Sequence, residues 1–160
     1  MKATGIVRRI DDLGRVVIPK EIRRTMRIRE GDPLEIYTTR DGEVIFKKYS
    51  LISGLEDFAA QFCDTLARST DFTAAVTDRD AVIAIAGAGK RELLGKRVSV
   101  ELERIMGERG VYCGPGVAVS DENGQFRVTV AAPILCEGDV LGAVLFLSAD
   151  DRTGGETECK

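Results

Sequence analysis

The stretch Asp11–Arg27, DDLGRVVIPKEIRRTMR, decides the fold of the first third of the chain. Its first four residues are typical of a turn, because Gly14 can adopt a positive φ. Pro19 suits the first position of a helix, since its φ is already fixed and it has no N–H group to leave unbonded. The following residues, KEIRRTMR, are good helix formers and place Ile22 and Met26 on one face. We therefore expect a turn, a short apolar segment and a two-turn helix.

Basic side chains gather around this helix. Arg15 precedes it, and Arg23, Arg24 and Arg27 lie within or just after it. Residues 1–50 carry 12 basic against 8 acidic side chains, a net charge of +4, whereas residues 51–160 carry 11 against 18, a net charge of −7. A basic head on an acidic body predicts that the head binds a polyanion, and it indicates a domain boundary near Ser50.

The composition excludes several classes of protein. With 160 residues, 44% hydrophobic and 31% charged, the chain is typical of a soluble globular protein of one or two domains. No apolar run is long enough to span a membrane, and residues 1–12 lack the apolar core of a secretory signal, so we expect a cytoplasmic protein.

The cysteine pattern argues against metal sites and catalysis. The four cysteines are widely spaced and the chain has no histidine, so we expect no metal, no cofactor and no catalytic residue. Thiols in a cytoplasmic protein are expected to be reduced. The four are Cys63, Cys113, Cys136 and Cys159.

The rest of the head is predicted to be mainly β-structure. Residues 4–10 and 15–18 are rich in β-branched side chains and predict two strands. Gly31 is expected to end the helix. Residues 34–39 and 43–48 predict a hairpin around Arg40-Asp41-Gly42, because Asp-Gly between two β-rich runs is a strong hairpin signal.

A head of about fifty residues seldom buries enough apolar surface to fold alone. Yet this one contains many apolar side chains and has no tryptophan. The simplest solution is a homodimer in which two heads share one core. Such a dimer would also present the arginines twice, with the two-fold symmetry of duplex DNA.

The sequence of Gly5–Tyr49 resembles the DNA-binding domain of the AbrB family of bacterial transition-state regulators. The resemblance rests on the ungapped core D-x-x-G-R-[IV]-x-[IL]-P-x-E-[IL]-R, which matches from Asp11 to Arg23. It implies a swapped-hairpin, dimeric β-barrel whose arginines contact DNA, and a regulator, activating or repressing, of late sporulation genes. The matching DNA-binding positions are Arg8, Arg15, Arg23 and Arg24, with Lys2, Arg9 and Lys20 as accessory positions.

The chemistry of arginine agrees with that implication. Its planar guanidinium donates two parallel hydrogen bonds to phosphate or guanine and keeps its charge at physiological pH. The head has no helix-turn-helix spacing, so we expect DNA shape to supply much of the selectivity, with A·T-rich duplexes preferred. Arg27 and Arg29 are expected to be solvated and balanced by nearby carboxylates. Lys47 and Lys48 have another interpretation, in which their charges protect an edge strand from aggregation.

After the head, residues 51–69 predict an amphipathic helix. Its apolar face consists of Leu51, Leu55, Phe58, Phe62 and Leu66. Ser53 is expected to be the N-cap, with Glu56 completing a capping box. Two roles remain open at this point: the helix pairs with its copy in a dimer, or it covers the sheet of its own body.

The remaining residues predict a mixed α and β body. Residues 72–78 and 81–86 predict a hairpin, residues 99–108 a helix, and residues 126–131, 134–136 and 140–148 three further strands. Gly89-Lys90 does not belong to a phosphate-binding loop, because Ala84 and Arg91 stand where that motif needs Gly and Ser or Thr. We expect a flexible loop there.

The run from Val128 to Asp150 resembles the last strand–turn–strand of GAF domains, with Pro133-Ile134 followed by G-x-x-x-G. The resemblance implies an antiparallel sheet flanked by helices, often with a small-molecule pocket. We therefore predict an α+β chain with three parts: a DNA-binding domain (1–50), a linker helix (51–70) and a GAF-like sensory or oligomerisation domain (71–160). The usual final helix of a GAF domain is expected to be missing, and the C-terminal domain is a candidate for homotetramer formation.

Two other functions compete with a dimeric regulator that binds double-stranded DNA. The same head occurs in antitoxins, which bind a toxin with a short tail. Some GAF-fold proteins are thiol reductases, although the scattered cysteines favour ordinary buried side chains.

Overall fold

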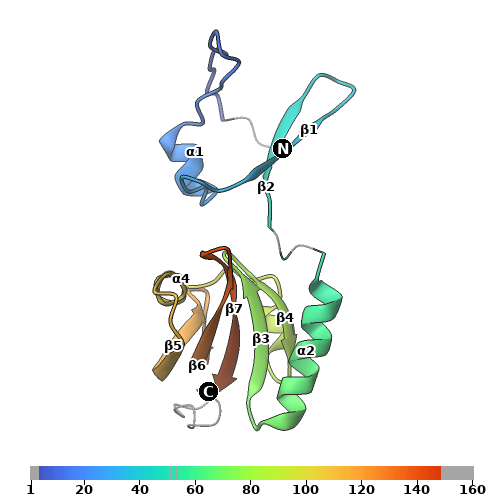
Figure 1. Ribbon diagram of the computed structural model, residues 1–160, viewed down its shortest axis with the longest axis vertical. Coiled ribbons are helices and arrows are strands. Elements are labelled where there is room, and N and C mark those ends of the chain that lie inside the picture. The colour runs from blue at the N-terminus through green and yellow to red at the C-terminus, as the bar shows by residue number, and fades with distance from the viewer. Residues whose placement is uncertain (1–3, 51, 53, 149–160) are drawn as a thin grey trace. The chain divides into compact units, whose positions relative to one another are not determined.

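The computed structural model describes residues 4–50, 52 and 54–148. The chain divides into two compact units, Met1–Tyr49 and Ser50–Lys160, and each is described by itself (Figure 1). The first unit contains helix α1 (Lys20–Thr25) and strands β1 (Leu34–Thr38) and β2 (Val44–Lys48). The helices of the second unit are α2 (Glu56–Ser69), α3 (Lys90–Leu93) and α4 (Val100–Gly107). Its strands are β3 (Thr73–Asp78), β4 (Val82–Ala86), β5 (Tyr112–Ser120), β6 (Asn123–Cys136) and β7 (Asp139–Ser148).

The predicted hairpin of the first unit is confirmed. Strands β1 and β2 pair antiparallel with Ile36 opposite Phe46 and Tyr37 opposite Ile45. Gly42 has a φ of +82° and its N–H donates to the carbonyl of Thr39 at 3.2 Å, which closes the turn. The alternation places Ile36 and Phe46 on one face of the hairpin and Tyr37 on the other.

The two strands expected in residues 4–10 and 15–18 are absent from the described chain. A β-strand requires a neighbour to pair with, and neither segment forms a ladder within this chain. Their apolar side chains are exposed: Val7 by 88%, Ile10 by 69% and Val17 by 70%. The prediction is therefore wrong for the single chain.

Helix α1 begins one residue later than expected. Pro19 is buried and occupies the N-cap position with a φ of −56° and a ψ of 148°, so Lys20 is the first helical residue. The carbonyl of Pro19 accepts the N–H of Arg23 at 3.0 Å, the first helical hydrogen bond. Proline lacks an N–H, but no helical hydrogen bond is lost, because the N–H groups at this end of a helix have no partner within the helix.

Helix α1 ends at Thr25, well before Gly31, so the predicted helix end is wrong. Arg27 adopts a left-handed φ of +50° and donates its N–H to the carbonyl of Arg24, while the N–H of Ile28 donates to the carbonyl of Arg23 at 2.8 Å. These two bonds form a Schellman motif with arginine where glycine is usual. Gly31, with a φ of +82°, instead lies in the next turn.

The second unit is built on a five-stranded antiparallel sheet in the order β4-β3-β7-β6-β5. The predicted hairpin of β3 and β4 is confirmed. Strands β6 and β7 are joined by a turn at Glu137-Gly138, where both residues have a positive φ. Residues 126–131 and 134–136 belong to one continuous strand, β6. Strand β5 was not predicted.

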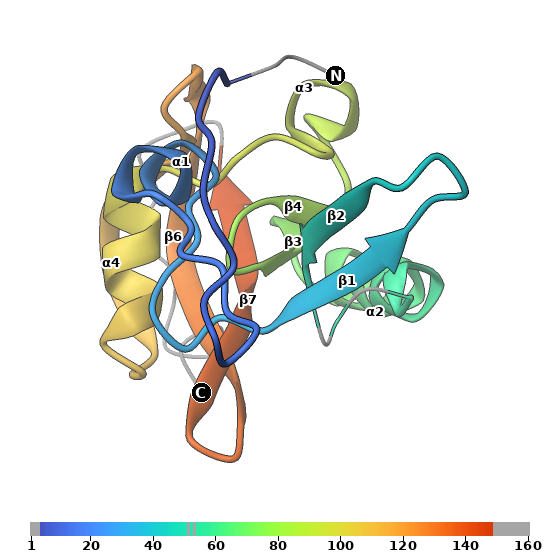
Figure 2. The same cartoon turned by 90° about the horizontal axis from the view of Figure 1, so that it is seen from above.

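Helices cover both faces of this sheet (Figures 1 and 2). Helix α2 packs on β3 and β4, with Ala59 and Cys63 buried against Ala74 and Val76 of the sheet. The helix therefore covers the sheet of its own body, which was one of the two open roles.

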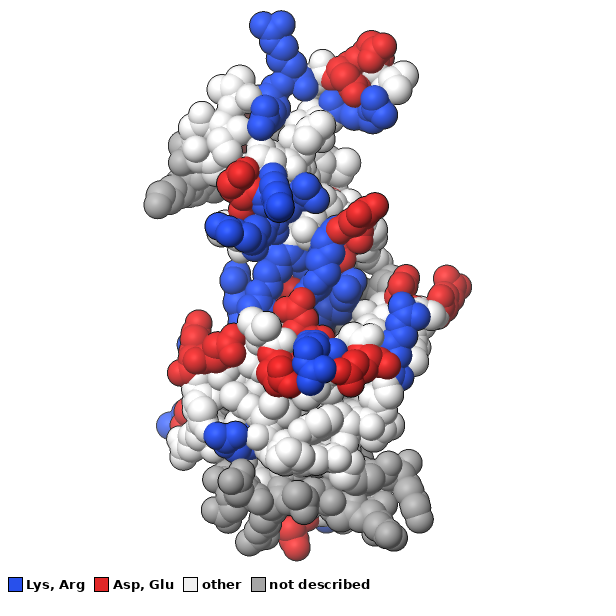
Figure 3. Space-filling view, turned by 90° about the vertical axis from the view of Figure 1, so that its left-hand side faces the viewer, with Lys and Arg blue, Asp and Glu red and all other residues white. Residues whose placement is uncertain are grey.

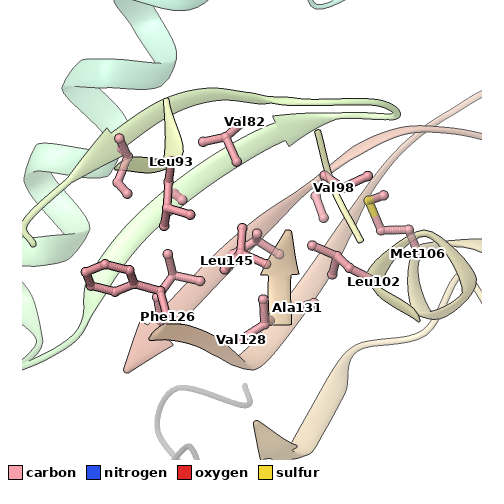
Figure 4. Close-up of a cluster of buried hydrophobic side chains, with 14 of the residues drawn as sticks. Val82, Leu93, Val98, Leu102, Met106, Phe126, Val128, Ala131 and Leu145 are labelled. Carbon is pink, nitrogen blue, oxygen red and sulfur yellow. The ribbon is translucent and has the colours of Figure 1, made fainter. Parts of the chain in front are cut away.

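Helices α3 and α4 pack on the opposite face and close the larger core (Figure 4). Leu93 of α3 and Leu102 of α4 are fully buried there against Leu145 of β7. The predicted helix at residues 99–108 is confirmed as α4, capped by Ser99, whose hydroxyl accepts the N–H of Leu102 at 3.1 Å.

Two local predictions about the second unit need correction. Helix α2 begins at Glu56 with Leu55 at the N-cap position and no side-chain cap, while Ser53, the expected N-cap, lies outside the described residues. The loop expected around Gly89-Lys90 includes the one-turn helix α3, and Gly89 precedes it with a φ of +81°.

The predicted α+β class is confirmed. No helix within the described ranges is long and apolar enough to cross a membrane. The expected lack of a final helix concerns residues 149–160, which lie outside the described part of the chain.

Candidate nucleic-acid interface

The basic residues singled out in the first unit are all exposed where the structure describes them. Figure 3 shows Lys and Arg side chains gathered over this unit on the face in view. Lys2 lies outside the described residues. The exposed positions are Arg8, Arg9, Arg15, Lys20, Arg23 and Arg24.

Arg15 is held in place by the loop that carries it. Its Nε donates to Oδ2 of Asp11 at 2.8 Å, and its backbone N–H donates to Oδ1 of the same carboxylate at 2.8 Å. Gly14 allows this loop to close by adopting a φ of +76°. The backbone N–H and the side chain of Arg15 together hold the pKa of Asp11 below its ordinary value. The Arg15 side chain is still 68% exposed.

Arg23 and Arg24 lie in the last turn of α1. Nε of Arg23 donates to the carbonyl of Ile18 at 3.2 Å, which fixes the base of its guanidinium against the segment before the helix. Arg24 makes no side-chain hydrogen bond or ion pair with the described residues. Cations are favoured at this end of a helix, because the backbone carbonyls there carry a partial negative charge.

A half-buried ion pair joins the loop after α1 to the hairpin. Nζ of Lys48 donates to the carbonyl of Arg27 at 3.0 Å and lies 3.6 Å from Oδ2 of Asp32, whose side chain is only 4% exposed. Asp32 also accepts the backbone N–H of Arg29 at 2.8 Å. Lys48 is thus a structural residue of the first unit rather than a guard of an edge strand.

The expectation that Arg27 and Arg29 are solvated is wrong. Both are half-buried, because they lie in the turns that connect α1 to β1. Both also take part in interactions with other residues. They belong to the scaffold that carries the exposed arginines.

The first unit leaves an unusual amount of apolar surface exposed. Ile36 is 61% exposed, Phe46 42% and Val44 58%, all from the hairpin. The segments before α1 add Ile6, Val7, Ile10, Leu13, Val16 and Val17. So many exposed apolar side chains in one small unit are typical of a chain that uses them in an interface.

The second unit offers little for catalysis. No group of three or more potential metal ligands occurs among the described residues. Cys63 is fully buried, and burial raises the pKa of its thiol to about 11, so it stays protonated and unreactive at neutral pH. Cys136 is exposed, whereas Cys113 is disulfide-bonded, which contradicts the expectation that the thiols are all reduced.

The role of Asp11 was missed from the sequence. The signal was present, because an Asp that is followed three residues later by a turn glycine is typical of a side chain that accepts backbone N–H groups. The half-buried pair of Asp32 and Lys48 had no such signal, since 16 positions separate the two residues.

Comparison with protein families gives two matches that divide the chain. Residues 54–160 match the family described as stage V sporulation protein T C-terminal, transcription factor. Residues 7–51 match the family described as antidote-toxin recognition MazE, bacterial antitoxin.

Curated relatives match the whole chain or its first part. Stage V sporulation protein T of Bacillus subtilis is 53% identical over 164 residues, covering 100% of this chain and 92% of that protein. The transition state regulatory protein AbrB of the same organism is 63% identical over 49 residues, which are 31% of this chain and 50% of that protein.

Among solved structures, the N-domain of the transcription factor abrB is similar to the first unit. The two sequences are 60% identical, and the match covers 31% of this chain and 94% of the abrB chain, with a TM-score of 0.29.

Proposed function

The chain belongs to the stage V sporulation protein T family of transcription factors, and we propose that its exposed arginines are the surface that contacts DNA. It is an AbrB-like, DNA-binding regulator of sporulation. This family consists of transcription factors and not of enzymes, so the thiol-reductase alternative is rejected. Since the relatives are bacterial, we place the protein in the cytoplasm, where bacterial DNA lies.

The observation that carries the proposal is the exposure of Arg15, Arg23 and Arg24 on one loop and one short helix. Arg15 and Arg23 are each held through Nε, so the outer edge of each guanidinium remains available to a phosphate or a base. Arg8 belongs to the same proposed group, with Lys2, Arg9 and Lys20 as accessory contacts. Because Arg15 and Arg23 are each already held by a hydrogen bond, less conformational entropy is lost at these two side chains when DNA binds.

We further propose that two chains form the DNA-binding unit. The exposed apolar residues of the hairpin and of residues 4–18 would then be buried in a shared core, in the manner of a swapped-hairpin barrel. The segments that find no strand partner within one chain would find one in the other. The proposed DNA is a double-stranded, A·T-rich promoter region.

Residues 1–50 are the proposed DNA-binding domain and residues 51–70 a linker helix. We propose that residues 71–160 form a GAF-like domain that either senses an unidentified small molecule or drives oligomerisation. On the outer face of α2, Leu55 is 50% exposed, Phe58 67% and Phe62 40%, and the rings of Phe58 and Phe62 stack at 6.4 Å. That apolar stripe supports association of C-terminal domains into a homotetramer.

A toxin-binding role is the second candidate, favoured by the match of residues 7–51 to an antitoxin family. Antitoxin tails are expected to be short and extended, whereas α2 and the five strands of the second unit pack around cores of their own. Limited proteolysis separates the two functions: a protease-resistant second unit argues against an antitoxin tail.

The test of the DNA-binding proposal is fluorescence anisotropy with an A·T-rich duplex over a range of salt concentrations. Arg15→Ala and Arg23→Ala should each weaken binding, and each lost phosphate contact should lower the slope of log K against log salt by about 1. Arg91→Ala is the matched control, because Arg91 is an exposed arginine of the second unit. Wild-type affinity and salt slope in the Arg15→Ala, Arg23→Ala double variant would refute the proposed surface.

A further inference from the structure

The carboxylate of Asp11 accepts three hydrogen bonds within the loop that carries Arg15. Its Oδ1 accepts the backbone N–H of Leu13 at 3.0 Å and that of Arg15 at 2.8 Å. Its Oδ2 accepts Nε of Arg15 at 2.8 Å. The backbone adds two bonds, from Asp11 N–H to the Arg15 carbonyl at 3.1 Å and from Gly14 N–H to the Asp11 carbonyl at 3.0 Å.

The two oxygens therefore do different things. Oδ1 closes the loop, while Oδ2 holds the guanidinium at its inner edge. A guanidinium has five N–H donors, so the bond through Nε leaves the four terminal ones for another acceptor. Because 68% of the Arg15 side chain is exposed, that outer end points into solvent rather than into the protein.

We propose that Asp11 is a positioning residue that aims Arg15 at DNA and so sets the selectivity of binding rather than its overall strength. The inference rests on the proposed function, since it assumes that Arg15 contacts DNA. An exposed ion pair of this kind adds little to folding stability. Its value lies in fixing the direction of the guanidinium before DNA arrives, because a hydrogen bond to a base edge requires one geometry, whereas contacts with phosphates carry no sequence information.

Electrostatics alone predicts a different result from the removal of Asp11: tighter binding to every duplex rather than a loss of selectivity. A carboxylate close to phosphates repels them, so its removal should tighten binding to any duplex. Asp12 is the matched control for that effect. It is the next residue, carries the same charge and is exposed, and no hydrogen bond or ion pair of its side chain is found within the described residues.

Two substitutions separate the two oxygens. Asp11→Asn retains an oxygen that can accept the N–H groups of Leu13 and Arg15, but it turns an amide donor toward Nε of Arg15. Asp11→Ala removes both functions. If the hydrogen bond from Nε of Arg15 to Oδ2 of Asp11 sets selectivity, the Asp11→Asn variant keeps the loop conformation and still loses selectivity.

The experiment uses the full chain and two duplexes of equal length and composition: one selected by the wild-type protein from a random pool, and a scrambled version of it. The readout is the ratio of the two affinities, in which the sequence-independent charge term cancels. Asp11→Asn should lower this ratio by about 3- to 10-fold, the range for one long side chain left unordered before binding. Asp12→Asn should tighten binding to both duplexes and leave the ratio unchanged.

Two further measurements distinguish positioning from a general structural role. The ¹H–¹⁵N signal of Arg15 Nε should be protected from exchange in the wild type and in Asp12→Asn, and lose that protection in Asp11→Asn. In an Arg15→Ala background, Asp11→Asn should no longer change the affinity ratio, because there is no guanidinium left to aim.

The inference and the proposed function fail in different ways. If Arg15→Ala leaves the affinity for both duplexes unchanged, the proposed DNA-binding surface is wrong. If Arg15→Ala weakens binding but Asp11→Asn behaves like Asp12→Asn, the surface stands and the role of Asp11 is refuted. A selectivity loss from Asp11→Asn that persists in the Arg15→Ala background also refutes it.

Discussion

Replacing Phe46 by alanine tests whether the hairpin of the first unit is a subunit interface. Phe46 lies opposite Ile36 on one face of the hairpin and is 42% exposed in the single chain. If two chains share a core through this face, the exposed part of the ring becomes buried on association. Phe46→Ala should then weaken the dimer, and with it DNA binding.

The exposed fraction sets the size of the effect. A phenylalanine side chain buries up to about 200 Å², so 42% exposure leaves roughly 85 Å² for a partner to cover. At about 25 cal/mol per Å², that area is worth roughly 2 kcal/mol per chain. The dimer contains the residue twice, so the loss is about 4 kcal/mol, or roughly a thousandfold in the dissociation constant.

Tyr37→Ala is the matched control. Tyr37 lies in the same hairpin, on the other face, and is 41% exposed, so both substitutions remove an aromatic ring that is buried to the same extent within its own chain. The hydroxyl of Tyr37 donates to Glu35 at 2.6 Å, and Nζ of Lys47 lies over the Tyr37 ring, 4.7 Å from its centroid. Tyr37 therefore already has interaction partners on this face of its own chain.

Sedimentation equilibrium over a dilution series of the full-length proteins measures the association, and anisotropy measures DNA binding. Any association through the second unit is common to the wild type and both variants. The reasoning is refuted if Phe46→Ala and Tyr37→Ala give the same dissociation constants, or if the wild type is monomeric where it binds DNA.

Two further predictions concern the second unit. A Cβ on Gly142 would lie 1.9 Å from the carbonyl oxygen of Thr77 in the paired strand, so Gly142→Ala should lower the unfolding free energy by about 3 kcal/mol or more. The control in thermal unfolding is Gly124→Ala, because a Cβ on Gly124 meets nothing within 4 Å. Equal melting temperatures for the two variants would contradict the packing argument. The pKa of the Cys63 thiol is raised from 9.0 to about 11, so folding favours the protonated form; unfolding free energy should be at its full value below pH 9 and fall as the pH rises toward 11. Cys63→Ala should reduce that fall in a series of urea melts, leaving the part that the raised pKa of Tyr37 contributes, whereas Cys136→Ala should keep the fall in full.

Where the fold could be predicted from the sequence, the signal was local. Asp41-Gly42 between two β-rich runs gave the hairpin of β1 and β2, and the run of residues 99–108 gave α4. Strand β5 was missed because YCGPGVAVS contains two glycines and a proline, which are turn residues in isolation. Its pairing with β6 is a tertiary effect that overrides those local preferences.

The end of α1 shows a second limit of sequence reasoning. Glycine is the usual residue at the left-handed position after a helix, so Gly31 was the natural choice. The chain instead places Arg27 there, and Lys48 bonds to the carbonyl of Arg27 from β2. A contact between residues 21 positions apart supports a conformation that the local sequence disfavours.

The candidate site was predictable in its residue types and not in its geometry. The arginines were identified through the resemblance of Gly5–Tyr49 to a known family. That Arg15 is held by Asp11 and Arg23 by the Ile18 carbonyl depends on distances that no spacing rule supplies. The half-burial of Arg27 and Arg29 likewise follows from the turns between α1 and β1, so charge counting alone overstates the available surface.

If the proposed arginines contact DNA, their small number predicts a link between DNA affinity and the proposed dimer. Four phosphate contacts per chain, from Arg8, Arg15, Arg23 and Arg24, give a slope of log K against log salt of about −4, whereas two chains give about −7. Only the larger value brings the protein into the range of 6–10 contacts that typical duplex-binding proteins use. If two heads pair as proposed, a chain whose net charge is −3 concentrates its arginines on one surface. For the same reason Phe46→Ala should halve the salt slope as well as weaken binding, although Phe46 itself carries no charge.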